Sequence, residues 1–252
     1  MTWSYGVVLV HPDDCAAANP RVLVMRRRHS YAFAEYVLGR YREEQLPRLV
    51  ARMSGRERGL LAGGAGFEDL AHGFDVFGRS AAARHRAQRA HRASAAQARQ
   101  LSRTVATTVT EPELSFPKGR MDKADRGCPR SAALRELHEE TGLPAGSVEL
   151  LPLDPVTDLY EDKDAGAGRR RWGTALYVGR MADGHRGERP DRRPAAGCEA
   201  SKVLWMTLDQ YRRDVTQWRG EAASAKLAMV LRRYRDWLSG TGGHCPRYLE
   251  PW

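Results

Sequence analysis

The sequence is poor in cysteine and has no long apolar run. Its four cysteines, Cys15, Cys128, Cys198 and Cys245, lie far apart in 252 residues and form no Cys-x-x-Cys pair. This spacing argues against a zinc knuckle and against a disulfide scaffold. No stretch approaches the roughly 18–20 apolar residues that a membrane-spanning helix needs. The first residues lack the basic flank and the apolar stretch of a signal peptide. We therefore expect an intracellular, cytoplasmic protein with no membrane span, and nothing in the sequence discloses its oligomeric state.

Acidic residues are missing from one long stretch of a chain that is basic overall. The chain has 41 Lys and Arg against 31 Asp and Glu, a formal charge of +10, yet no acidic residue lies between Asp75 and Glu111. The same stretch is rich in alanine, which favours helix. Most of its arginines recur at three- and four-residue steps, which predicts a basic helix face. The arginines assigned to RNA binding are Arg84, Arg86, Arg89, Arg92, Arg99 and Arg103.

A basic face of this kind suits a phosphate backbone. Guanidinium groups pair with phosphate oxygens and release counterions. The alternative, an ordinary solvated helix face, normally mixes charges of both signs. The sequence therefore predicts a nucleic-acid partner, bound without sequence readout.

The pattern of elements predicts a mixed α/β domain interrupted by a helical insertion. The apolar share of 42% is enough for a packed core, which excludes global disorder. We divide the chain into a first part of the α/β domain at 1–40, an inserted basic helical subdomain at 41–106, and a second part at 107–252. The strands expected from β-rich runs are 3–10, 21–27, 105–116, 147–152, 155–160, 171–181 and 200–206. The helices expected outside the insertion are 129–141 and an amphipathic helix at 221–238.

Three glutamates converge within the first of these helices. Glu136, Glu139 and Glu140 stand at positions i, i+3 and i+4, so their carboxylates share one helix face. Three adjacent anions repel each other unless a cation neutralises them, and hard oxygen ligands suit Mg²⁺ or Mn²⁺. Arg135 precedes them and can orient a carboxylate by a bidentate pair. Gly142 is expected to end the helix.

This region resembles the Nudix box, a pattern of Gly, Glu and a terminal Arg-Glu-U-x-Glu-Glu-x-Gly-U string in which U is aliphatic. The matching residues within 119–143 are Gly119, Arg135, Glu136, Leu137, Glu139, Glu140, Gly142 and Leu143. Two departures concern the loop that contacts the helix in the family, not the metal-binding face. The interval from Gly119 to Arg135 is two residues longer than in the pattern. No glutamate takes the place of the pattern's first one, which falls on Gly127 or on Asp125 according to the direction of counting.

Three further segments are similar to the mRNA-decapping Nudix enzymes of large DNA viruses, of the poxvirus and African swine fever virus type. They are 27–36, Phe116-Pro117-Lys118-Gly119 and the segment 198–205. The resemblance implies an α/β Nudix fold, a viral protein that acts on host mRNA in the cytoplasm of the host cell, and capped mRNA as substrate. The products would be 7-methylguanosine diphosphate and 5′-monophosphate RNA.

The resemblance also implies roles for single residues. Mg²⁺ or Mn²⁺ would be held by Glu136, Glu139, Glu140 and the backbone carbonyl of Gly119. The residues assigned to catalysis are Glu140, Glu199, Arg135 and Lys118. The general base is either Glu140 or Glu199, and Lys118 would contact phosphate oxygens.

The pocket for the cap remains unknown from the sequence. A methylated guanine is cationic, so aromatic rings are expected around it. No spacing singles out a pair among the candidates, which are Trp3, Tyr5, Phe33, Tyr36, Tyr160 and Trp172.

Two other functions stay open. A Nudix hydrolase of small, highly phosphorylated substrates, such as diphosphoinositol polyphosphates or dinucleoside polyphosphates, would also use a basic surface. A catalytically inactive RNA-binding protein on a degenerate Nudix fold is the other, although the intact Glu136, Glu139 and Glu140 speak against it.

Overall fold

The computed structural model describes residues 1–14, 19–72, 74, 80–107, 109–161, 171–182, 185, 190, 200–219 and 221–240. These residues form two compact units. One contains Met1–Met25 together with the described residues from Leu114 onward, and the other contains Arg26–Glu113. No helix in the described ranges is long and apolar enough to cross a membrane.

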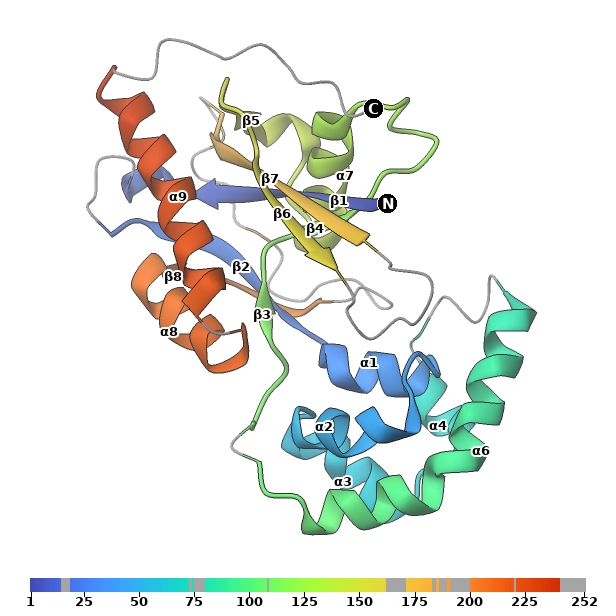
Figure 1. Cartoon of the computed structure of the whole chain (residues 1–252). Helices are drawn as coiled ribbons and strands as arrows, with labels where there is room; N and C mark the ends of the chain where they lie inside the picture. The colour runs from blue at the N-terminus through green and yellow to red at the C-terminus, as the bar shows by residue number, and fades with distance from the viewer. Residues whose placement is uncertain are drawn as a thin grey trace. The chain divides into compact units, whose positions relative to one another are not determined.

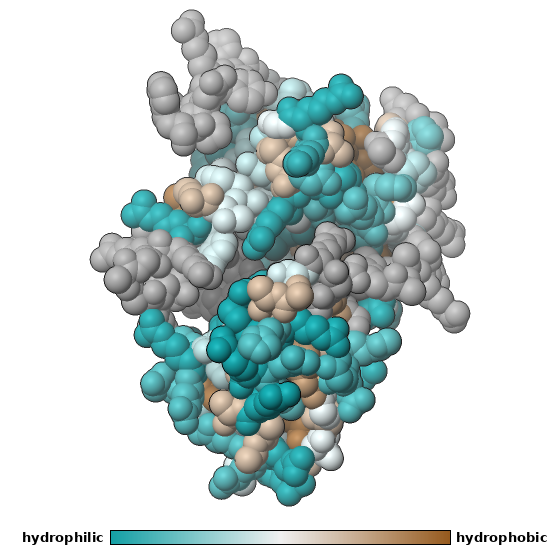
Figure 2. All heavy atoms as spheres, turned by 90° about the vertical axis from the view of Figure 1, so that its right-hand side faces the viewer, coloured by the Kyte–Doolittle hydropathy of each residue, from teal (hydrophilic) through white to brown (hydrophobic). Residues whose placement is uncertain are grey.

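The unit Arg26–Glu113 is helical. Its α-helices are α1 (Tyr31–Val37), α2 (Leu46–Ala51), α3 (Gly55–Gly63), α4 (Phe67–Ala71) and α6 (Ala81–Thr104), with a short 3-10 turn η2 (Glu43–Gln45). α6 buries small residues, Ala87, Ser94 and Ala98 among them, at seven- and four-residue steps, so its large basic side chains lie on the outer face. Hydrophilic side chains predominate in the lower part of Figure 2, where α6 faces the viewer.

One buried carboxylate ties two helix starts of this unit together. Ser30 caps α1 by accepting a hydrogen bond from the Phe33 amide at 3.0 Å. Glu57 of α3 accepts from the Ser30 amide at 2.6 Å, from the Ser30 hydroxyl at 2.7 Å and from the Ser54 amide at 2.8 Å. Phe33 and Tyr36 follow on α1 and lie in the apolar core of the unit. Much of segment 27–36 therefore has a structural role.

The other unit is built on a mixed sheet. Its strands are β1 (Thr2–Val10), β2 (Arg21–Arg27), β3 (Leu114–Ser115), β4 (Lys118–Arg120), β5 (Val148–Leu150), β6 (Val156–Glu161), β7 (Arg171–Met181) and β8 (Ala200–Thr207). The strand order is β3-β2-β1-β7-β5, with β4 on β1, β6 on β7 and β8 on β2. β1 runs parallel to β7 over its whole length, from Thr2 opposite Trp172 to Val10 opposite Arg180. Short 3-10 turns lie at η1 (Pro12–Asp14) and η3 (Ala145–Ser147).

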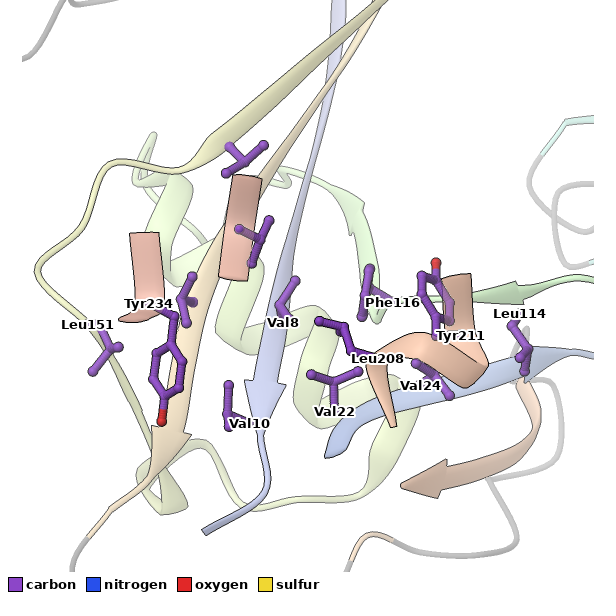
Figure 3. Packing of buried hydrophobic residues seen from close by; sticks show 13 residues of the cluster. Val8, Val10, Val22, Val24, Leu114, Phe116, Leu151, Leu208, Tyr211 and Tyr234 are labelled. Atoms are coloured by element: carbon purple, nitrogen blue, oxygen red, sulfur yellow. The ribbon is translucent and has the colours of Figure 1, made fainter. Parts of the chain in front are cut away.

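Helices cover both faces of this sheet (Figure 1). α7 (Pro129–Thr141) packs against β1 and β4. On the other face Val8 and Val10 of β1 pack against Leu208 of α8 (Leu208–Arg219) and Tyr234 of α9 (Glu221–Leu238). Figure 3 shows these side chains meeting those of Val22, Val24 and Phe116 in one apolar core. The α/β fold with a mixed sheet is confirmed.

The predicted strand at 105–116 is mostly wrong. Of the residues that the structure describes between 105 and 116, only Leu114 and Ser115 pair in the sheet. The hydroxyl of Thr107 instead donates to the carbonyl of Ala51 at 2.7 Å. Thr and Val favour strands on average, but here a tertiary contact within the helical unit overrides that preference. α8 was not foreseen, although its start carries a readable signal. The amide of Gln210 donates to the Thr207 hydroxyl at 3.4 Å and the amide of Thr207 to the Gln210 side chain at 2.9 Å, which is a capping box.

Candidate active site

The carboxylate-bearing helix has the limits that the sequence predicts. Pro129 stands in the first turn, where its missing N–H costs nothing. Gly142 ends the helix in the left-handed conformation, with φ of 72°. Ala132, Ala133 and Leu137 are buried against the sheet. This packing fixes the rotation of the helix, and with it the direction of Glu136 and Glu140.

Glu136 and Glu140 both lie beside strand β4. A β-carbon on Gly119 would overlap the carboxylate of Glu136, so this carboxylate lies directly over the backbone of residue 119. Glu140 is buried, with 7% of its surface exposed, and accepts a hydrogen bond from the Lys118 amide at 2.9 Å. The structure therefore brings the first and last glutamates of the Nudix-like string against strand β4, Glu136 at Gly119 and Glu140 at Lys118.

Arg135 is the centre of the ion pairs at this site. Its Nε and Nη2 atoms donate to the two carboxylate oxygens of Asp125 at 3.0 and 2.9 Å. Nη1 donates to Glu136 at 2.9 Å and to Glu139 at 3.0 Å. Nη2 also donates to the Arg120 carbonyl at 2.7 Å. The hydrogen bond with Asp125 and the neighbouring carboxylates raise the pKa of Arg135, so the guanidinium stays charged.

Asp125 supplies the contact between loop and helix that the sequence left open between Gly127 and Asp125. Its carboxylate is almost fully buried, receives the bidentate pair from Arg135 and accepts from the Asp122 amide at 2.8 Å. An aspartate side chain is one methylene shorter than a glutamate. Only the three-dimensional arrangement identifies this residue, because counting along the chain gives two answers.

Removing the Asp125 carboxylate is expected to lower the stability of the fold and to leave RNA binding largely unchanged. The hydrogen bond from Arg135 holds the pKa of Asp125 below its ordinary value of 3.8. A lowered folded-state pKa contributes stability above the ordinary value and loses it as the pH falls through the folded value. We expect Asp125→Ala to lower the free energy of unfolding at pH 7 by about 2 kcal/mol and to flatten its fall below pH 4. Urea denaturation at several pH values measures both; an unchanged curve contradicts the role given to Asp125.

The predicted metal ligands carry the donors that Mg²⁺ and Mn²⁺ prefer. The predicted donors are carboxylate oxygens and one backbone carbonyl oxygen, and the Glu136 carboxylate lies directly over the backbone of Gly119. Within the ranges that the structure describes, no three His, Cys, Asp or Glu side chains already form a metal-holding group. Glu136 and Glu139 are held by Arg135, and Glu140 by the Lys118 amide. The donor types fit, and the assignment of Glu136, Glu139, Glu140 and Gly119 as ligands stays a prediction.

The side chain of Lys118 leaves the strand on the other face. Lys118 pairs with Gly6 of β1, and a β-carbon on Gly6 would lie 2.5 Å from that of Lys118. Its neighbour Gly119 faces α7. At this site Lys118 acts through its backbone amide, and contact of its ammonium group with phosphate stays a prediction. Glu199 lies outside the described residues.

The predicted RNA-binding arginines differ in their surroundings. Arg84 forms an ion pair with Glu68 of α4, and Arg103 donates to the Ala62 carbonyl at 2.7 Å. The guanidinium of Arg99 lies against Gly64, at the end of α3. Arg86, Arg89 and Arg92 are exposed, and within the described part of the chain they make no hydrogen bond or ion pair.

Replacing Gly119 by alanine is expected to lower the activity strongly while sparing the fold. The new β-carbon would displace the carboxylate of Glu136, which ends a flexible side chain and can move away. We expect cleavage to fall by on the order of 100-fold and the melting temperature to change little. Gly146→Ala is the matched control, because nothing lies within 4 Å of its added β-carbon. Activity that survives in Gly119→Ala contradicts the placement of Glu136.

A family match agrees with this geometry. Residues 96–227 match the model of the NUDIX domain, which spans more than half of the chain. The chain belongs to the NUDIX domain family. The match begins within α6, so β1 and β2 complete the sheet of this Nudix hydrolase fold from outside the matched segment. Enzymes of this family generally use divalent metal ions.

Two of the solved structures that match the chain have TM-scores below 0.5. A C. elegans Ap4A hydrolase binary complex has a TM-score of 0.44 and 10% identity, covering 95% of this chain and 99% of that one. RenU, a Nudix hydrolase from M. smegmatis, has a TM-score of 0.40 and 16% identity, covering 98% and 90%. No curated protein matches the chain. Similarity of this degree does not bear on the substrate.

Proposed function

We propose that this Nudix hydrolase is a divalent-metal-dependent decapping enzyme, which cleaves the pyrophosphate linkage of the 5′ cap of mRNA. The observation that carries the proposal is the presence of two separate features in one chain. One is the cluster of Glu136 and Glu140 at Gly119, with donors suited to a cation. The other is the exposed arginine face of α6. A small nucleotide needs the first feature alone, whereas a long RNA also gains affinity from the second.

The chemistry follows from the charge of the substrate. A diphosphate is a dense anion, so water must attack phosphorus against negative charge. A divalent cation bound by Glu136, Glu139, Glu140 and the Gly119 carbonyl would neutralise the non-bridging oxygens and acidify a bound water. Arg135 positions Glu136 and Glu139 through one nitrogen, Nη1. Glu140, oriented by the Lys118 amide, or Glu199 would then take the proton of the attacking water.

Cleavage of cap-labelled RNA tests the proposal. With Mg²⁺ or Mn²⁺ we expect release of 7-methylguanosine diphosphate and 5′-monophosphate RNA, and a chelator should stop it. Unlabelled 5′-triphosphate RNA serves as the control for general phosphatase activity. No release of label at any metal concentration contradicts decapping.

A second candidate is hydrolysis of dinucleoside or diphosphoinositol polyphosphates. One observation favours it: Arg84, Arg99 and Arg103 are engaged within their own unit, which leaves a shorter basic face for RNA. The same preparation should therefore be tested on diadenosine tetraphosphate and on a diphosphoinositol polyphosphate. Cleavage of these alone would assign the chain to small substrates. RNA binding with no hydrolysis of any of them would identify a binding protein.

A further inference from the structure

Two aromatic side chains near the start of β1 lie outside both apolar cores. Trp3 and Tyr5 are two residues apart, so they project from the same face of the strand. Their ring centroids are 6.4 Å apart and their planes differ by 20°. Both are partly exposed, and neither belongs to the clusters of buried apolar residues in the described part of the chain. Partly exposed rings that do not fill a core can offer their exposed surface to a ligand.

The strand register places this pair beside the Nudix box. Tyr5 lies directly opposite Gly119 of β4, and residues opposite each other in an antiparallel pair have side chains on the same face. That face of Gly119 carries the Glu136 carboxylate. Tyr5 therefore projects from the face on which α7 presents its carboxylates. Trp3 is the next residue along the strand on this face.

A glycine on the neighbouring strand leaves room for the indole ring of Trp3. Trp3 lies opposite Gly173 of β7, and a β-carbon at 173 would overlap the indole ring. The indole therefore lies close over the backbone of β7, in a space that a larger residue would fill. The Tyr5 ring is nearly parallel to it. Two nearly parallel rings with partly exposed surfaces therefore lie side by side along the strand, where a planar ligand can stack on them.

We infer that Trp3 and Tyr5 form a stacking platform for the nucleobase of the substrate, next to the site that holds its diphosphate. The inference rests on the proposed function only in taking a nucleotide as the substrate. Purine bases stack on aromatic side chains whatever their sequence context. A 7-methylguanine is also cationic, so its attraction to the ring faces exceeds that of guanine. The platform thus favours 7-methylguanosine diphosphate over guanosine diphosphate, and either over inorganic pyrophosphate.

Equilibrium dialysis with labelled ligands tests the platform without relying on cleavage. The probes are 7-methylguanosine diphosphate, guanosine diphosphate and inorganic pyrophosphate, each with Mg²⁺. In Trp3→Ala we expect the Kd of 7-methylguanosine diphosphate to rise by about 5- to 100-fold, while the Kd of pyrophosphate stays unchanged. Trp3→Phe should restore most of the affinity, and Gly173→Ala should lose part of it because the indole is displaced. Trp205→Ala removes a partly exposed tryptophan from β8 and should bind all three ligands as the wild type does.

The outcomes separate the platform from the proposed function. Equal binding of the methylated nucleotide by wild type and Trp3→Ala overturns the platform, and so does an equal loss for pyrophosphate. Either result leaves decapping intact if capped RNA is still cleaved. Conversely, Trp3-dependent nucleotide binding by a protein that cleaves no capped RNA supports the platform and removes decapping.

Discussion

Glu140→Gln is expected to lose about 10²- to 10⁴-fold in the rate of cap release while it binds RNA as the wild type does. Glu140 is buried on α7 and receives the Lys118 amide at 2.9 Å. Glutamine keeps the shape and retains a carbonyl oxygen for that hydrogen bond. It loses the negative charge that a cation or the proton of a water would need. The loss should therefore fall on catalysis and not on folding.

The experiment measures the single-turnover rate and the RNA affinity on the same preparations. RNA affinity should not change, because α6 belongs to the other compact unit. Glu149→Gln is the matched control. Glu149 is an exposed residue of β5 that forms an ion pair with Arg180 of β7, so its replacement should leave the rate and the RNA affinity unchanged. A rate within tenfold of wild type would show that Glu140 is not essential. Loss of RNA affinity would show that the site and the basic face are not independent.

The choice between Glu140 and Glu199 as general base can be made by the same assay. The variant that lacks the base should lose the acidic limb of the pH–rate profile, whereas loss of a metal ligand should raise the concentration of metal needed for half-maximal rate.

Replacing Arg86, Arg89 and Arg92 together by alanine is expected to weaken RNA binding by on the order of 10- to 100-fold at low salt. These three are exposed arginines of α6 that make no hydrogen bond or ion pair within the described residues, and unlike Arg99 they do not lie against Gly64 of the neighbouring helix. Each phosphate contact contributes about 0.7 to the slope of log affinity against log salt for a single strand, so the slope should fall by about 2. Alanine preserves the helix.

The matched control removes arginines that the structure engages elsewhere. Arg84→Ala and Arg103→Ala lose contacts to Glu68 and to the Ala62 carbonyl. We expect these changes to lower the melting temperature more than the RNA affinity. Filter binding from 50 to 300 mM salt gives the slopes, and an unchanged slope in the triple variant would refute RNA binding by this face.

The local features of the site could be predicted from sequence because they depend on spacing along one helix. The 3.6-residue period places Glu136 and Glu140 together, and Gly142 marks the end of the helix. The partner of Arg135 could not be predicted in the same way. It depends on how the loop before α7 folds, which brings Asp125 to Arg135 instead of Gly127.

The basic face of α6 likewise depends partly on spacing along one helix and partly on tertiary packing. Alanine content and arginine spacing predict α6 and its outward side. Which arginines remain available depends on α3 and α4, whose packing brings Gly64 to Arg99 and Glu68 to Arg84. The aromatic platform shows a third case. Six aromatic residues are candidates by type. Strand register sets Tyr5 opposite Gly119 and Trp3 opposite Gly173, whereas Phe33 and Tyr36 lie in the core of the helical unit.

The most direct test of the account compares kcat/KM for a capped RNA of about 30 nucleotides with that for the same cap as a dinucleotide. Cleavage of both linkages uses the same carboxylates, but only the RNA carries a long phosphate backbone for the arginines of α6 to bind. The account predicts a higher kcat/KM for the RNA, with an advantage that shrinks as salt increases and disappears in the Arg86, Arg89 and Arg92 triple variant. Equal values for the two substrates, or cleavage of the dinucleotide alone, would contradict it.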